Sequence, residues 1–149
     1  MTDAINNEAG AGEGRPPIEE RGELTLALDG QDLVLRPSFE AIAAFEEQTG
    51  KGLLELAREG IAGKLRLGEA AQIACECVRA WGRATGAKAM QGVNAGRVAE
   101  LILESPGGFQ AALTTIAGML AMATTGGYTS QGEVKAGTTT MTSGLPAAS

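Results

Sequence analysis

Two short runs of alternating leucines, joined by Asp29-Gly30, constrain the fold of this chain more than any other feature. Aspartate and glycine tolerate the positive φ angles that a two-residue type I′ turn requires. Counting outward from this turn places the leucines on one face of a predicted hairpin, with Leu24 opposite Leu35, Leu26 opposite Leu33 and Leu28 opposite Gln31. The other face pairs Thr25 with Val34, Ala27 with Asp32 and Glu23 with Arg36. Because an isolated hairpin is marginal in water, we expect the first helix to cover the leucine face.

Five segments with helical spacing of apolar residues follow the hairpin. The first starts at Pro37 and Ser38, which suit a helix N-terminus, and ends at Gly50. The next two span about residues 52–59, ending before Gly60, and 68–84. The fourth begins after Asn94 and the last after Pro106. The predicted fold is α+β and mostly α, with an N-terminal β-hairpin packed on four to five short helices.

The two ends of the chain contain few large apolar residues. Residues 1–20 hold five acidic residues and one arginine among glycines and prolines, and residues 124–149 are rich in threonine, serine and glycine. Neither segment can bury enough apolar surface to offset the entropy lost on ordering. We therefore expect disordered tails at 1–20 and 124–149, and one hairpin-plus-helices domain at 21–123.

Charge and hydropathy exclude several functional classes. The net charge is −6 and no long Lys/Arg run occurs, so nucleic acid and anionic membrane surfaces are not expected partners. The N-terminus lacks the basic and apolar regions of a secretory signal. The apolar segment 109–123 is too short and too polar to cross a bilayer. We expect a soluble protein that is not secreted and acts in a reducing cytoplasm.

No catalytic, metal or cofactor site is predicted. The chain has no histidine, and neither a G-x-S-x-G nor an S-x-x-K motif occurs. Cys75 and Cys77 lie two positions apart, so on a helix they diverge by about 200° and favour small buried hydrophobes over a metal pair. The glycine run at 10–14 lacks the context of a phosphate loop. The carboxylates of the first helix, Glu40, Glu46 and Glu47, are typical of a solvated face.

Three apolar residues are candidates for partner binding. Trp81, between Arg79 and Arg83, suits an exposed aromatic anchor, although core packing gives the same pattern. Met119 and Met122 lie on a helix that is apolar on more than one side. Such methionines suit either an adaptable partner groove or burial against several neighbours, and burial is the favoured interpretation.

Residues 22–56 resemble a family of small tail-assembly proteins of phages and gene transfer agents. The motif residues that carry the likeness are Asp29, Gly30, Arg36, Pro37, Ser38 and Phe39. Further matches are Gly22-Glu23, Leu24, Leu26, Leu35, Ala41-Ile42, Glu46, Gly50 and residues 53–56. The similarity continues more loosely over the helices to about residue 123.

This resemblance implies a tail assembly chaperone that coats the aggregation-prone tape-measure protein in the bacterial host cytoplasm until tail-tube subunits polymerise around it. The implied partners are the tape-measure protein and, less directly, the tail-tube protein, and self-association into a homo-oligomer is compatible with this role. The alternative is a structural tail subunit, either a tail-tube or a minor tail protein. Tail tubes as a class are built from extensive β-sheet, whereas about a dozen residues here are predicted as strand.

Overall fold

The computed structural model describes residues 24–28 and 30–135. Within these ranges the chain forms one hairpin and six helices, which confirms the predicted α+β, mostly α class. The elements are β1 (Leu24–Leu28), β2 (Gln31–Leu35), α2 (Phe39–Thr49), α3 (Leu53–Ala62), α4 (Leu67–Thr85), α5 (Lys88–Gln91), α6 (Ala95–Glu104) and α7 (Gly108–Thr124). The expectations for residues 1–20 and 136–149 lie outside the described residues.

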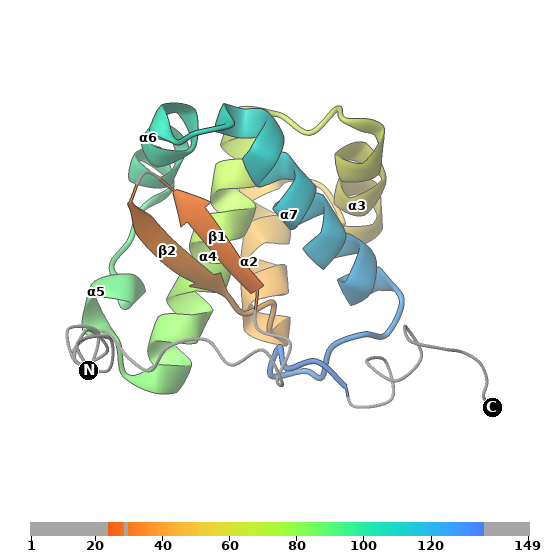
Figure 1. Cartoon of the computed structure of the whole chain (residues 1–149). Coiled ribbons are helices and arrows are strands. Elements are labelled where there is room, and N and C mark those ends of the chain that lie inside the picture. The colour runs from red at the N-terminus through yellow and green to blue at the C-terminus, as the bar shows by residue number, and fades with distance from the viewer. Residues whose placement is uncertain (1–23, 29, 136–149) are drawn as a thin grey trace.

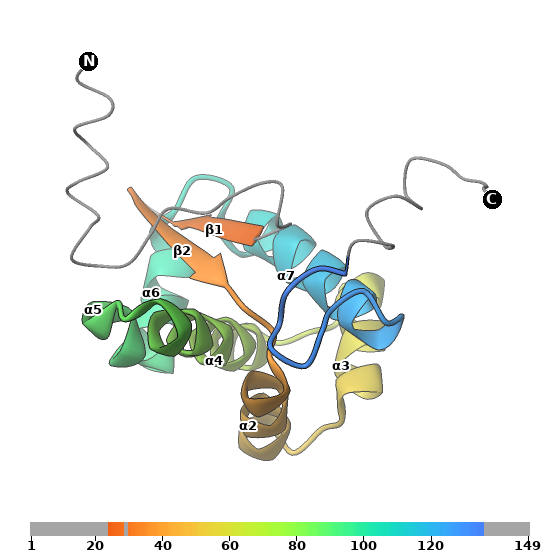
Figure 2. The same ribbon diagram turned by 90° about the horizontal axis from the view of Figure 1, so that it is seen from below.

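Helix α4 is the centre of the molecule (Figure 1). Seen from below, the hairpin and α7 lie on one side of α4 and α2 lies on the other (Figure 2). Helices α5 and α6 pack against α4, and α3 packs along α7. Residues Ala70 to Val78 of α4 are buried except Gln72, so this helix is enclosed on nearly all sides.

The hairpin register agrees with the prediction at every described pair. Leu24 pairs with Leu35, Leu26 with Leu33, and Leu28 with Gln31. The expected Glu23–Arg36 pair and the first turn residue, Asp29, lie outside the described residues, whereas Gly30 has the positive φ (84°) that the turn requires. The turn residues and the alternation of leucines therefore determine the register of this hairpin.

The prediction that the first helix covers the leucine face was wrong. The principal contacts of the hairpin are with α4, α6 and α7. At the end of β2, the Arg36 N–H donates to the Cys77 carbonyl of α4 at 3.1 Å. The chain therefore passes α4 before α2 begins, and α2 packs on the opposite side of it (Figure 2).

Helix α2 begins at Phe39, two residues after Pro37, which was expected in its first turn, and it ends before Gly50 as predicted. Ser38 Oγ accepts the Ala41 N–H at 3.1 Å, and Gly50 has a left-handed conformation at the C-cap. Asn94 likewise caps α6 by accepting the Arg97 N–H. Helix α5 was not predicted, because its four residues are too few to show an apolar period.

Helix α3 does not stop at Gly60 as predicted but continues to Ala62 and ends at Gly63. Gly60 is buried against α7, where an added Cβ would lie 3.2 Å from the Ala117 Cβ. This glycine therefore permits close helix packing and does not terminate the helix.

Residues 125–135, assigned above to the C-terminal tail, pack on the domain. An isolated bridge joins Tyr128 to Val134, and the Phe39 N–H donates to the Ser130 carbonyl at 2.7 Å. Tyr128 is half-buried against the main core. The described domain thus extends 12 residues beyond the predicted boundary at 123, because long-range contacts compensate for the low local hydrophobicity.

Candidate functional site

The described residues contain no group of three or more side chains that could hold a metal ion. Cys75 and Cys77 are both buried, and burial raises the pKa of each thiol. Cys77 Sγ lies 3.8 Å from Met119 Sδ, whereas Cys75 Sγ donates to the Val93 carbonyl, so the two thiols have different neighbours. These cysteines pack as small hydrophobes. The glycine run at 10–14 lies outside the described residues.

The carboxylates of α2 have separate environments. Glu40 and Glu47 are exposed. Glu46 Oε2 accepts the Leu53 N–H at 2.8 Å and so caps α3, which begins at a glycine without a capping side chain. Glu46 therefore caps a helix, and Glu40 and Glu47 are exposed to solvent.

None of the helices in the described part of the chain is both long and apolar enough to span a lipid bilayer.

The motif residues Arg36 to Phe39 fasten the segment after α7 to the domain. Arg36 Nε donates to the Gln131 carbonyl at 2.8 Å, and its Nη2 lies 3.3 Å from Glu133 Oε2. Gly132 is held so closely that an added Cβ would lie 2.7 Å from the Ser38 nitrogen. The motif therefore has a structural explanation, except for the side chain of Phe39.

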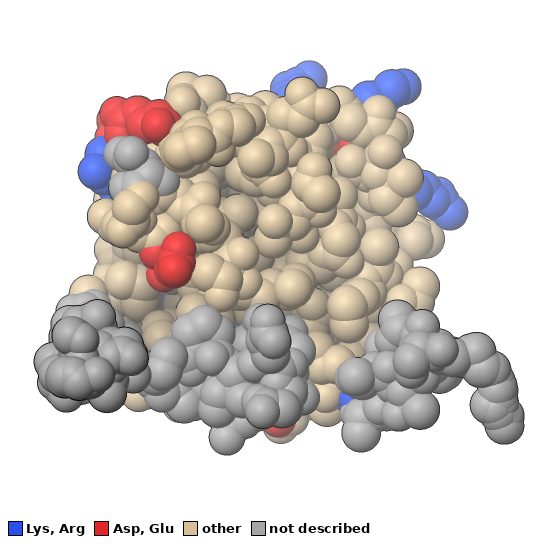
Figure 3. Space-filling view, viewed as in Figure 1, with Lys and Arg blue, Asp and Glu red and all other residues tan. Residues whose placement is uncertain are grey.

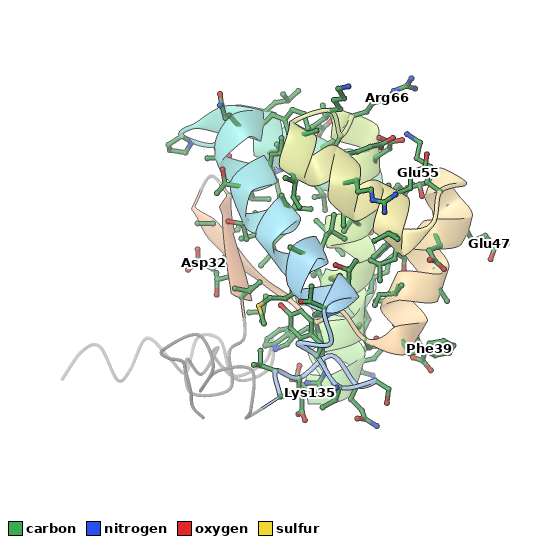
Figure 4. All side chains as sticks on the ribbon, turned by 90° about the vertical axis from the view of Figure 1, so that its right-hand side faces the viewer. Asp32, Phe39, Glu47, Glu55, Arg66 and Lys135 are labelled. Carbon is green, nitrogen blue, oxygen red and sulfur yellow. The ribbon has the colours of Figure 1, made fainter. Side chains whose placement is uncertain are left out.

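Phe39 is 69% exposed and projects into solvent from the start of α2 (Figure 4). It borders a surface depression of about 410 Å³, which is lined by Arg36, Ser38, Phe39, Glu40, Ala80, Arg83, Ala84, Ser130 and Gln131. Arg83 and Glu40 face each other loosely there, with an N–O distance of 3.9 Å. The depression therefore combines an exposed phenylalanine with an arginine and a glutamate.

The three candidates for partner binding have different positions. Met119 is fully buried, and Trp81 is 5% exposed, packing with Val34 and Ala87. Both therefore belong to the interior of the domain. Met122, near the end of α7, is half-buried and is the one candidate of the three with substantial surface.

Large exposed apolar side chains lie elsewhere, at Phe39, Leu54, Ile61 and Leu103. Leu54 and Ile61 are both on α3, seven residues apart, and are 53% and 70% exposed. Positions seven apart lie on the same side of a helix. This pair was not predicted from the sequence, because the helix was expected to end before Gly60, whereas α3 continues to Ala62.

Helices α3 and α7 together present a weakly charged surface, the α3–α7 surface, made of Leu54, Arg58, Ile61, Gln110, Thr114 and Gly118. Helix α7 contains no Asp, Glu, Lys or Arg. In Figure 3 most of this face of the molecule is uncharged, with basic residues at its upper and right margins and acidic residues on its left side. Glu55 points from the side of α3 that faces away from α7 (Figure 4). Around the axis of α3, Leu54 and Ile61 are displaced from Glu55 by about 100–120°, toward α7.

Comparison with known proteins gave one result. A family model described as phage tail tube protein, GTA-gp10, matches residues 21–124. The match covers more than half of the 149 residues and spans the hairpin and the helices α2 to α7. No significant match was found among curated proteins or among solved structures.

Proposed function

This chain belongs to the phage tail tube protein family GTA-gp10, and within that family we propose that it is a non-catalytic tail assembly chaperone that binds the tape-measure protein. The family makes it a phage or gene transfer agent tail protein. The proposal adds a role within tail assembly, in which the chain keeps its client in solution in the bacterial host cytoplasm.

The observation that carries the proposal is the helical architecture with exposed apolar side chains. The described residues contain ten strand residues in one hairpin, and the remaining elements are helices. Leu54 and Ile61 are more than half exposed on the same side of α3. Amphipathic segments of a long client can bind to such helix faces through apolar contacts.

A tail-tube subunit is the second candidate, and the family description favours it. A tube of β-sheet would need edges that pair between subunits, and such strand pairing would recruit β1 and β2. The two candidates differ in one respect that can be measured, because a tube subunit remains in the particle and a chaperone leaves it.

Co-expression with the tape-measure protein from the same genome tests the chaperone role. We expect the soluble fraction of the tape-measure protein to increase several-fold and the two chains to copurify. An unrelated acidic helical domain of similar size is the control. Equal solubility with and without this chain would contradict the proposal.

Quantitative mass spectrometry of purified particles separates the two candidates. A chaperone should be nearly absent, whereas a tube subunit should be among the most abundant proteins. A copy number comparable to that of the major tail proteins would replace the first proposal with the second.

A further inference from the structure

We propose that the α3–α7 surface is the docking site for an amphipathic client helix whose apolar stripe is flanked by acidic residues. This inference rests on the proposed function and adds the binding face and the chemistry of the segment it takes. Three observations carry it: the exposed aliphatic pair on α3, the uncharged outer side of α7, and three exposed basic residues on α3 and directly after it.

The aliphatic pair supplies the apolar contact. Leu54 and Ile61 are two turns apart on α3, which matches the repeat at which an amphipathic helix presents its own anchors. Both side chains are too exposed to contribute much to the core. Apolar groups on the same side of an exposed helix gain free energy when a partner covers them.

The outer side of α7 allows a partner to approach closely. Gln110, Thr114 and Gly118 are exposed at four-residue intervals, and a Cβ added at Gly118 would meet nothing within 4 Å. Gly60 keeps α3 and α7 in close contact through Ala117. The two helices therefore form one continuous surface without a charged group on the α7 side.

Basic residues near the α3–α7 surface indicate the charge of the partner. Arg58, Lys64 and Arg66 are exposed, and none of their side-chain cations forms an ion pair within 4 Å among the described residues, although the Arg66 backbone N–H donates to Glu69 Oε1 at 3.0 Å. The nearby Lys51 differs, because its Nζ lies 3.0 Å from Glu59 Oε1 and 2.7 Å from Glu69 Oε2. On a chain with net charge −6, three exposed cations without ion-pair partners within residues 58–66 favour a partner with acidic residues beside its apolar stripe.

The test measures binding of the copurified tape-measure protein to purified variants of the full chain. We expect Leu54→Glu and Ile61→Glu each to weaken binding about tenfold or more, because an acidic group would replace an apolar contact. The matched control is Leu103→Glu, which places the same charge at a 60% exposed leucine on α6 and should bind like wild type. Thermal unfolding of each variant verifies that the domain stays folded.

The charge contribution is tested separately. Arg58→Glu combined with Lys64→Glu should weaken binding and reduce its dependence on salt, whereas Lys88→Glu on α5 should change neither. Equal binding by wild type, Leu54→Glu and Ile61→Glu would overturn the inference and leave the chaperone role intact. No binding by wild type would overturn both.

Self-association is the competing use of the same surface. Sedimentation of the wild-type chain alone should show a species whose size does not change in Leu54→Glu or Ile61→Glu. If the wild type is a dimer and these variants are monomers, the surface binds a second copy and the inference is wrong.

Discussion

Arg36 joins two segments that lie 95 residues apart in the sequence. Its guanidinium donates to the Gln131 carbonyl and contacts Glu133, while its backbone N–H donates to Cys77 of α4. The side chain is 13% exposed, so these bonds are partly shielded from water. A single residue thus holds the end of the hairpin, the central helix and the segment after α7 together.

Arg36→Ala should lower the free energy of unfolding by about 1–2 kcal/mol, because a charge-assisted hydrogen bond and a partly shielded ion pair are lost. Urea denaturation measures the change. Arg97→Ala is the control, since Arg97 pairs with Glu100 on an exposed face and should change stability little. Equal losses in both variants would show that Arg36 contributes no more than a surface charge.

Tyr128 carries a buried hydroxyl that has no hydrogen-bond partner among the described residues. Burial, with a smaller contribution from the nearby Cys77, raises the pKa of Tyr128 from 10.0 to about 12. The folded state therefore favours the neutral phenol. The stabilisation of the folded state that comes from keeping Tyr128 protonated is fully present below pH 10. It is lost as the pH rises from about 10 to about 12.

Tyr128→Phe should reduce the loss of stability between pH 10 and 12 and leave stability at pH 7 unchanged or slightly higher. Urea denaturation at pH 7, 10 and 11.5 measures this. Since Tyr128 is the only tyrosine, the difference between wild type and variant reports this group directly. Parallel pH profiles for the two proteins would contradict the assignment.

At the scale of elements, close backbone approaches determine how the helices pack. Helix α5 lies against the Gly82 segment of α4, and the Gly82 carbonyl accepts the Ala87 N–H at 3.0 Å and the Gln91 side-chain amide at 3.2 Å. A Cβ added at Gly82 would lie 2.9 Å from the Ala87 carbonyl oxygen. The short helix exists because this contact is available.

Gly82→Ala should destabilise the domain by about 1–3 kcal/mol, because backbone atoms of α5 must move. The same change at Gly118, inside α7, has open space and should stabilise by about 0.5–1 kcal/mol through helix propensity. Thermal denaturation of both variants provides the comparison. A neutral or stabilising Gly82→Ala would show that α5 adjusts freely.

At the scale of the whole molecule, the folded domain continues past its last helix, α7. Residues 125–135 return from α7 to the start of α2 and lie beside it (Figure 2). The family match ends at residue 124, so residues 125–135 lie outside the matched region. It closes the side of the core where Tyr128 packs.

A chain ending at Thr124 should be less stable than one ending at Lys135 by about 2–4 kcal/mol, because the burial of Tyr128 and the bonds of Arg36 are lost. Urea denaturation of the two truncated chains measures this. Equal stability of the two truncated chains would place the domain boundary at α7.

Much of the local structure could be predicted from the sequence because local residues determine it. The hairpin register follows from a two-residue turn and an alternation of leucines, and the ends of α2 follow from Ser38 and Gly50. The start of α6 follows from Asn94 in the same way. Turn and cap chemistry acts over three or four residues, so it can be recognised without knowledge of the fold.

Only the tertiary structure decided which surfaces meet. The leucine face lies against α4, α6 and α7, Gly60 serves packing instead of ending a helix, and residues 125–135 join the domain. Trp81 and Met119, candidates for partner binding for which core packing was the favoured alternative, are buried, and Leu54 and Ile61 are exposed. Apolar spacing shows that a helix has an apolar side, but which neighbour covers that side depends on long-range contacts, and these form only when the whole chain packs.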